Sequence, residues 1–185
     1  MTLNEIVSQV TVDVPEAPLM TVREQIKRMA RELCQDSEAW AVEGLVVVAA
    51  KSGYPQLLAP EGGEVLRILE LYDGDRLMRP GQDFEQRRPD SIEILRKPQS
   101  DTLTGRLACR PETGADLPDT LLKDWGDTLA NGARWRLLLM PQPWQNPELG
   151  SYYQAQYRIG STDAKRLAIL GHARGGNRVK ARRFI

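Results

Sequence analysis

The sequence predicts an α+β protein in which helical segments near both ends of the chain enclose a β-rich insertion and precede an extended C-terminal tail. Apolar residues recur with helical spacing in residues 22–35 and 117–160, whereas residues 41–113 contain short strand-like segments separated by turn residues. A chain of 185 residues is long enough for one domain with a sizeable insertion. The predicted parts are an N-terminal arm with the first helix at 1–40, the β-rich insertion at 41–113, a helical hairpin at 114–170 and a basic tail at 171–185.

The first 19 residues are predicted to form an N-terminal arm or an edge strand. Valines alternate with other residues from Val10 to Val14, Ile6 precedes them, and Pro15 and Pro18 favour an extended chain. This arm is expected to lead directly into the first helix.

The first helix is expected from about Val22 to Gln35. Thr21 and Glu24 have the spacing of a capping box, in which a hydroxyl and a carboxylate satisfy otherwise free amides. One side of this helix is apolar and is predicted to be buried: Val22, Ile26, Met29, Ala30 and Leu33. The other side is basic and is predicted to be a solvated face: Arg23, Lys27, Arg28 and Arg31.

The insertion is predicted to consist of short strands. Five segments have suitable patterns: Val42–Ala50, Tyr54–Leu58, Glu64–Tyr72, Ser91–Arg96 and Leu103–Arg110. Asp73 and Gly74 tolerate the positive φ angles of a type I′ turn, so they predict a tight hairpin with Leu71-Tyr72 and Asp75-Arg76 as its strand ends. Residues 79–90, with two prolines and a glycine, are predicted to be a loop.

Residues 117–160 are predicted to form two helices joined by a short, proline-stiffened connection. The first helix has an apolar face with spacings of three and four residues: Leu121, Trp125, Leu129, Ala133, Leu137 and Met140. Pro141 and Pro143 cannot continue this helix because proline lacks the amide proton. Asn146 and Pro147 are typical of the N-cap and first residue of a second helix.

Two glycines and three tryptophans in this stretch suggest contacts. Gly126 and Gly132 each cost a helix up to about 1 kcal/mol relative to alanine, so we expect a neighbouring helix or subunit to approach closely there. Trp125 lies on the apolar face and is assigned to the core, and Trp144 is expected to pack the turn back on the helices. Trp135 lies off that face, so it is the better candidate for a subunit interface, as are the two glycines.

The formal net charge of zero conceals an acidic body and a basic tail. Residues 1–157 contain 17 Lys and Arg against 24 Asp and Glu, whereas residues 158–185 contain 8 against 1. The tail combines a flexible Gly-Gly joint with spaced cations and an apolar end: Arg174, Arg178, Lys180, Arg182, Arg183, Phe184 and Ile185. Because it has little apolar surface, it is expected to be disordered alone and to order against a partner.

The sequence lacks the motifs of an enzyme, so no catalytic, cofactor-binding or metal site is predicted. His172 is the only histidine, and no Walker loop, GxSxG or GxGxxG motif occurs. Asp124 and Asp127 are interpreted as an acidic helix surface. Cys34 and Cys109 are expected to be buried free thiols in a reducing cytosolic setting. No apolar run long enough for a membrane span and no signal peptide is visible, so no membrane partner is expected.

The sequence resembles the head-to-tail adaptor, or connector, proteins of tailed bacteriophages. The resemblance is most specific in residues 29–40, which end in ARELCQDSEAW, and in residues 117–160, LPDTLLKDWGDTLANGARWRLLLMPQPWQNPELGSYYQAQYRIG. The order of parts also agrees: a first helix, a β-rich insertion, a helix with LLKDW, a PxPWxNP turn, a last helix with a Tyr-Tyr pair and an Arg-rich end. The chain departs from the pattern at Gly126 and Gly132, where alanine is expected.

This resemblance implies a structural protein of the virion neck. Such proteins form rings, usually of twelve copies, that dock under the portal protein, connect the head to a downstream tail or nozzle protein, and line the channel through which genomic DNA leaves. They are made and assembled in the host cytoplasm. The helical domain would build the ring, and the basic tail, from Arg174 to Ile185, would reach along the portal. No enzymatic activity and no cofactor are implied.

A second hypothesis is a protein that binds nucleic acid without sequence specificity. The basic tail could contact phosphates in a salt-dependent manner. The acidic body argues against a broad DNA-binding face, and the tail has no aromatic residue apart from Phe184. An enzyme is a third and weaker hypothesis.

Overall fold

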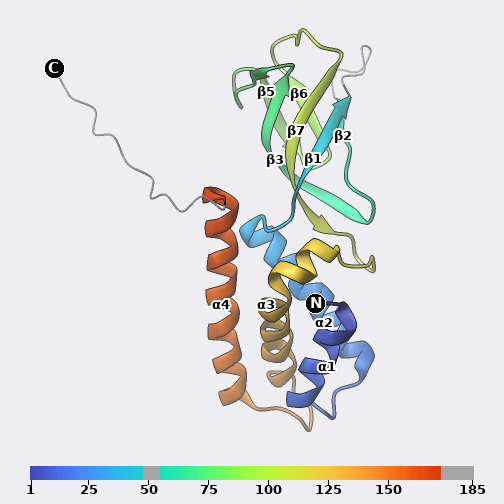
Figure 1. Ribbon diagram of the computed structural model, residues 1–185, viewed down its shortest axis with the longest axis vertical. Coiled ribbons are helices and arrows are strands. Elements are labelled where there is room, and N and C mark those ends of the chain that lie inside the picture. The colour runs from blue at the N-terminus through green and yellow to red at the C-terminus, as the bar shows by residue number, and fades with distance from the viewer. Residues whose placement is uncertain (48–54, 172–185) are drawn as a thin grey trace, which may run out of the picture.

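The computed structural model describes residues 1–47 and 55–171 and shows an elongated α+β molecule, with a helical body at one end and a β-sheet at the other (Figure 1). The predicted mixed fold class is confirmed. In chain order the elements are α1 (Leu3–Asp13), α2 (Leu19–Ser37), β1 (Ala41–Val47), β2 (Gln56–Leu57), β3 (Gly63–Asp73), β4 (Arg76–Leu77), β5 (Phe84–Arg88), β6 (Ser91–Ile94), β7 (Thr102–Pro111), α3 (Asp119–Leu138) and α4 (Pro147–Leu170). The sheet is thus inserted between α2 and α3.

The N-terminal segment is a helix, so the predicted arm or edge strand is wrong. In α1, the Thr2 side chain accepts a hydrogen bond from the Glu5 amide at 3.3 Å, and the Glu5 carboxylate accepts one from the Thr2 amide at 2.8 Å. This capping box starts the helix. The helix then buries one face: Ile6, Val7 and Val10. Packing of this face against α3 outweighs the preference of valine for strands.

Helix α2 is longer than predicted and begins differently. It starts at Leu19 after an N-cap at Pro18, and no side chain caps it, so the predicted Thr21–Glu24 capping box is wrong. Thr21 already lies inside the first turn. The predicted apolar face is confirmed as buried: Val22, Ile26, Met29, Ala30 and Leu33.

The strands form one seven-stranded sheet in the described part of the chain, in the order β4-β3-β7-β1-β2-β6-β5, and each pair of neighbours is antiparallel. The long strand β7 lies between β3 and β1. Four of the five predicted strand segments overlap β1, β3, β6 and β7, and the fifth contains the short strand β2. Residues 48–50 and 54 of the predicted segments lie outside the described residues. Strand β5, with the sequence FEQRR, lies in the predicted loop, so that part of the prediction is wrong.

The hairpin between β3 and β4 is confirmed, but its turn is shifted by one residue. Asp73 pairs with Arg76, so the central turn residues are Gly74 and Asp75. Gly74 has φ +60°, and a positive φ at the first central residue alone fits a type II′ turn rather than type I′. Asp73 remains in the strand because its carboxylate accepts hydrogen bonds from the amides of Gln99 and Ser100, both at 2.9 Å.

Replacement of Gly74 by valine is expected to lower the free energy of unfolding by about 2 kcal/mol, because a β-branched residue tolerates positive φ poorly. Thermal and urea unfolding would measure the change. Asp75→Val is the matched control, since Asp75 is an exposed turn residue without positive φ. Equal stability of both variants and the wild type would contradict the assigned turn.

The predicted helical hairpin is confirmed as α3 and α4. Asn146 accepts a hydrogen bond from the Leu149 amide at 3.1 Å, and Pro147 is the first residue of α4, as expected. Trp144 packs against the core and donates from Nε1 to the Leu137 carbonyl at 3.2 Å, so it holds the turn to α3. Trp125 is half-buried against the core.

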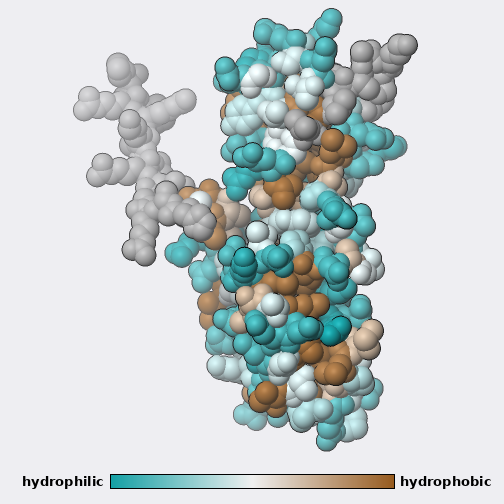
Figure 2. All heavy atoms as spheres, turned by 45° about the vertical axis from the view of Figure 1, so that its right-hand side comes forward, coloured by the Kyte–Doolittle hydropathy of each residue, from teal (hydrophilic) through white to brown (hydrophobic). Residues whose placement is uncertain are grey.

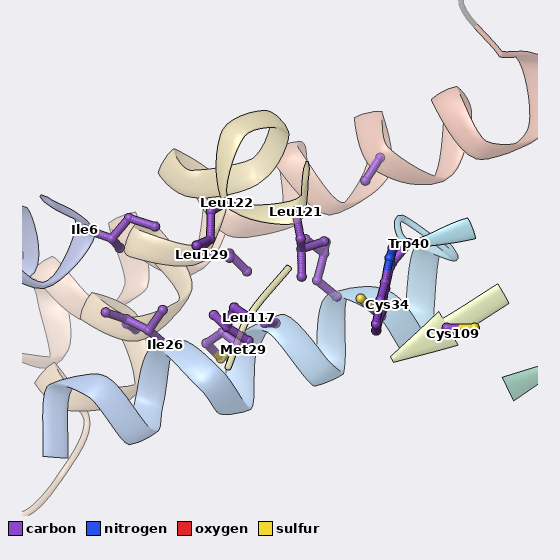
Figure 3. Packing of buried hydrophobic residues seen from close by; sticks show 14 of the residues in the cluster. Ile6, Ile26, Met29, Cys34, Trp40, Cys109, Leu117, Leu121, Leu122 and Leu129 are labelled. Carbon is purple, nitrogen blue, oxygen red and sulfur yellow. The ribbon is translucent and has the colours of Figure 1, made fainter. Parts of the chain in front are cut away.

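Helices α1, α2 and α3 bury their apolar side chains in one core that continues into the sheet. Figure 3 shows Ile6, Ile26, Met29 and Leu129 meeting from three helices, and Trp40 beside Cys34 at the end of α2. Beyond Trp40 lies β7 with Cys109. No described helix is long and apolar enough to cross a membrane.

Candidate subunit and partner interface

The two glycines predicted at close contacts are both buried in α3. A Cβ added at Gly126 would lie 2.6 Å from Met1 Sδ and 3.4 Å from Ile6 Cδ1. A Cβ at Gly132 would lie 2.9 Å from both Met29 Cγ and Tyr157 Cδ2. The predicted close approach of neighbouring helices is confirmed. Because these neighbours belong to the same chain, they account for both glycines without a second subunit.

Trp135, the third predicted interface residue, is half-buried between α3, α2 and α4. Its ring centroid lies 5.8 Å from that of Tyr157, and the Arg136 guanidinium stacks 4.3 Å from the Trp135 centroid. Arg136 also binds both carboxylate oxygens of Glu32 on α2, at 2.9 and 3.2 Å. These contacts fix Trp135 within the chain, and its role at a subunit interface stays a prediction.

A pocket next to Trp135 is lined by α2, α3 and α4, and the sequence did not indicate it. Its lining includes the carboxylates of Glu32 and Asp36 and the side chains of Trp135, Arg136 and Tyr157. Among the described residues, Trp135 Nε1, Arg136 Nε and the Tyr157 hydroxyl are buried without a hydrogen-bond partner. Burial and the neighbouring carboxylates of Glu32 and Asp36 raise the pKa of Tyr157 well above its usual value. Its hydroxyl therefore stays protonated.

Tyr157→Phe is expected to leave the free energy of unfolding unchanged or to raise it by up to about 1 kcal/mol, since removing a buried, unpaired hydroxyl removes a desolvation cost. Only 5% of Tyr157 is exposed, so the ring itself must be kept. Urea denaturation would measure the effect, with Tyr153→Phe as the comparison on the same helix face. A loss above about 1 kcal/mol would show that the Tyr157 hydroxyl is hydrogen-bonded in solution.

Helix α4 carries two parallel rows of side chains with alternating spacings of three and four residues. The inner row faces the bundle and is buried or half-buried: Gly150, Tyr153, Tyr157, Gly160, Ala164 and Leu167. We call the second row the outer seam, and all of its members are exposed: Tyr152, Ala155, Ile159, Thr162, Arg166 and Ile169. The rows are two residues apart, or about 200° around the helix, so the outer seam points away from the bundle.

A second group of exposed apolar residues gathers around the turn between α1 and α2, and we call it the α1–α2 patch: Val12, Pro15, Leu19 and Met20. Val12 is 79% exposed and Met20 68% exposed. Figure 2 shows apolar patches that interrupt the polar surface of the helical body. Exposed apolar side chains that cluster, rather than occurring singly, are typical of protein–protein contact surfaces.

The joint between the helical body and the sheet is built from ion pairs. Glu64 on β3 binds Arg110 on β7 at 2.8 Å and Arg31 on α2 at 3.4 Å, and Arg31 also donates to the Pro111 carbonyl. Burial alone would raise the pKa of Glu64, but the hydrogen bonds from Arg110 and Arg31 outweigh it and lower the pKa. The prediction that Arg31 belongs to a solvated face is therefore wrong, as it is for Lys27, which donates to the Gly114 carbonyl at 3.1 Å.

Two buried carboxylates organise the outer end of the sheet around one arginine. Arg76 lies 3.8 Å from Asp73 and 3.4 Å from Asp83. The Gln99 amide, helped by Ser100 and Arg76 and opposed by desolvation, lowers the pKa of Asp73. Asp83 likewise has a lowered pKa, mainly because it accepts a hydrogen bond from the Arg79 amide at 2.8 Å.

These lowered pKa values predict acid sensitivity of the sheet. The stabilisation from Asp73 and Asp83 is complete above the pKa of an unfolded aspartate, about 3.9, and is lost as the pH falls from there through the lower folded values. Urea midpoints measured between pH 7 and pH 3 should fall steeply below about pH 4. Asp73→Asn should be less stable at pH 7 and should flatten this dependence. Asp124→Asn, at an exposed position on α3, should behave like the wild type.

The cysteines are free and buried, as predicted. Burial and the neighbouring Cys109 raise the pKa of Cys34 to about 12, and burial raises that of Cys109 to about 11. Both are therefore protonated and unreactive near neutral pH. Among the described residues, no cluster of His, Cys, Asp or Glu is arranged to hold a metal ion. Asp124 and Asp127 are exposed, in agreement with an acidic helix surface.

The predicted docking residues of the basic tail, from Arg174 to Ile185, lie outside the described residues, as does His172. Helix α4 precedes them and ends at Leu170, and its C-terminal half exposes Arg158, Lys165 and Arg166. No model of a known protein family matches the chain, and no curated protein sequence matches it.

Proposed function

We propose that this protein is a structural component of a bacteriophage neck, which forms a ring under the portal and connects the head to the tail. The observation that carries the proposal is the helical hairpin of α3 and α4, closed by the turn at residues 141–147, with an outer seam on α4 whose members are all exposed. The order of parts, a helix followed by a sheet and then this hairpin, is the order expected from the resemblance to adaptor proteins.

Several properties of the molecule support an assembly role. The polar pocket beside Trp135 has no nucleophile hydrogen-bonded to a base among the described residues. Six apolar residues that are more than half exposed lie on helices, where a rigid backbone holds them in place: Val12, Leu19, Met20, Tyr152, Ile159 and Ile169. In this proposal the helical body builds the ring, the ring lumen passes genomic DNA, and residues 171–185 dock on the portal with Phe184 and Ile185 as apolar anchors.

Electron microscopy tests the proposal, using the protein alone and mixed with the portal protein encoded by the same genome. Rings stacked on portal rings are expected, together with a mass increase of the portal complex in sedimentation. Removal of residues 171–185, and separately Phe184→Ser with Ile185→Ser, should weaken this co-assembly at least tenfold. A full-length protein that leaves the portal unchanged, at any protein ratio, would contradict the proposal.

Nucleic-acid binding is the competing function, and one observation favours it. Arg158, Lys165 and Arg166 on α4 extend the positive charge of the tail onto the described helix. If the protein served mainly to bind DNA, removal of residues 171–185 would abolish a salt-sensitive affinity for DNA fragments and leave portal binding unaffected. In the neck proposal, the same truncation weakens binding to the portal and leaves the affinity for DNA fragments nearly unchanged.

A further inference from the structure

The outer seam of α4 has the geometry of a helix that lacks its partner. Apolar or small residues at spacings of three and four are the pattern by which one helix packs along another. On α4 the inner row is covered by α2 and α3, and the outer seam repeats the same spacing with four apolar or small members: Tyr152, Ala155, Ile159 and Ile169. Ile159 in the middle of the outer seam is 58% exposed and Ile169 near its end is 67% exposed.

The outer seam and the α1–α2 patch lie on opposite sides of the helical body. Figure 1 shows α4 along one side and α1 with α2 on the other, with α3 between them. Helix α3 packs against all three other helices. A molecule with two different apolar surfaces on opposite sides can bind a second copy of itself head to tail.

The charges of the two surfaces are complementary. Arg158 and Lys165 are exposed beside the outer seam, and Arg166 within it lies 3.7 Å from the carboxylate of Asp163. The region around the α1–α2 patch exposes three carboxylates and one arginine: Glu5, Glu16, Glu24 and Arg23. The Arg23 guanidinium is in addition bound to the Asn4 side chain at 2.9 Å. A basic surface therefore meets an acidic one when two copies align head to tail, which favours this pairing over others.

We propose that the outer seam of α4 in one copy of this chain docks on the α1–α2 patch of the next copy. Symmetric pairing of two α4 helices is disfavoured because it would bring the cations of both seams together. The head-to-tail contact leaves one free surface at each end of a pair, so further copies add until the ring closes. This contact deepens the proposed neck function, on which it rests, by naming the two surfaces that build the ring.

The length of the seam indicates how strong each contact is. Residues 152–169 span about 26 Å at 1.5 Å per residue. A single helix face of this length buries less than the roughly 800 Å² per partner of a standard stable interface. Each contact is therefore weak by itself, and a closed ring, in which every subunit makes two such contacts, is much more stable than a pair.

Cysteine cross-linking tests the contact and captures weak association. A mixture of Ile159→Cys and Met20→Cys proteins, treated with a short bismaleimide, should give a cross-linked heterodimer, whereas each variant alone should give almost none. The native cysteines are buried and do not interfere. Leu77→Cys, 54% exposed on β4, is the matched control and should not cross-link with either variant. Homodimers of Ile159→Cys alone, or no cross-link at any protein concentration, would overturn the contact.

Charge insertion gives a second readout. Ile159→Asp and Met20→Asp should each weaken self-association at least tenfold in sedimentation, while circular dichroism and thermal unfolding stay unchanged because both positions are exposed. Mixed at equal amounts, the two variants should form dimers and nothing larger. The intact outer seam of Met20→Asp can dock on the intact α1–α2 patch of Ile159→Asp, and the two remaining surfaces of the dimer both carry an aspartate. The proposal would be overturned if either variant, or the mixture of both, self-associated as strongly as the wild-type protein in sedimentation. Leu77→Asp should assemble like the wild type.

The outcome separates this contact from the neck function. Variants that still form rings and still join the portal would overturn the contact and leave the neck function in place. Loss of self-association in both variants, together with wild-type rings that do not bind the portal, would support the contact and overturn the neck function.

Discussion

Gly160→Ala is expected to lower the free energy of unfolding by about 2 to 3 kcal/mol, although alanine is the better helix former by up to about 1 kcal/mol. The reason is the crossing of α3 and α4. A Cβ at Gly160 would lie 2.7 Å from Thr128 Cγ2 and 3.0 Å from Thr128 Cβ, atoms close to the backbone of α3 that cannot move aside. The helices would have to separate, and the inner row of α4 would lose contact with the core.

Gly126→Ala is the matched control for this experiment. The new methyl group would meet Met1 Sδ, near the free end of a flexible side chain, and Ile6 Cδ1 at an ordinary 3.4 Å. We therefore expect a change within about 1 kcal/mol, in either direction, because the gain in helix propensity offsets the small displacement. Leucine at Gly126 is too large for this displacement and should destabilise the bundle by about 1 to 3 kcal/mol.

A double-mutant cycle makes the Gly160 prediction specific. Thr128→Ala removes Oγ1 and Cγ2, the two atoms that a Cβ at Gly160 would approach most closely, so the loss in the double variant should be smaller than the sum of the two single losses by about 1 to 2 kcal/mol. Urea denaturation of the four proteins would provide the values. Additive effects, or wild-type stability of Gly160→Ala, would mean that α4 lies farther from α3 in solution.

Trp40→Ala is expected to lower the free energy of unfolding by about 3 to 5 kcal/mol. Trp40 is buried where α2 ends and β1 begins, its carbonyl accepts a hydrogen bond from the Cys109 amide at 2.8 Å, and its ring covers Gly63 so closely that a Cβ there would lie 2.7 Å from Trp40 Cη2. Its loss leaves a cavity that the surrounding strands and helices cannot fill.

Trp144→Ala provides the comparison, because Trp144 is only half-buried and belongs to the turn between α3 and α4, which lies at the end of the helical body away from the sheet (Figure 1). Its loss should be about 1 to 2 kcal/mol and should leave hydrogen exchange in the sheet unchanged. Trp40→Ala should instead speed exchange in both β1 and β7. If both variants changed exchange in the same amides, Trp40 would have no special role in joining helices and sheet.

The parts of the fold that could be predicted from sequence are those whose signals are local. Proline and asparagine positions determine the turn before α4, and the spacing of apolar residues identifies the buried faces of α2 and α3. Helix α1 was missed because its valines fit a strand equally well, and packing against α3 decides between the two. Strand β5 was missed because only Phe84 of its five residues is buried, as is common at a sheet edge.

The remaining features depend on residues that are far apart in the sequence. The hairpin turn is shifted because Asp73 binds amides 26 and 27 residues away. Arg31 is not a solvated residue because Glu64 and Pro111 lie within its reach only after the sheet has folded. The pocket beside Trp135 combines three helices, and spacing within one helix cannot indicate it. Both rows of α4 have helical spacing in the sequence, but only the structure shows which row the other helices cover.

The chain enters and leaves the sheet through two strands that are paired with each other. Strand β1 follows α2, strand β7 leads to α3, and Ala41 pairs with Ala108 at the point where both reach the helices. An insertion whose two ends are neighbours can grow, shrink or be exchanged at its far end without changing the course of any helix. The sheet can therefore change in size and in surface while the helices keep their own geometry, so that one helical scaffold can present different surfaces at its far end.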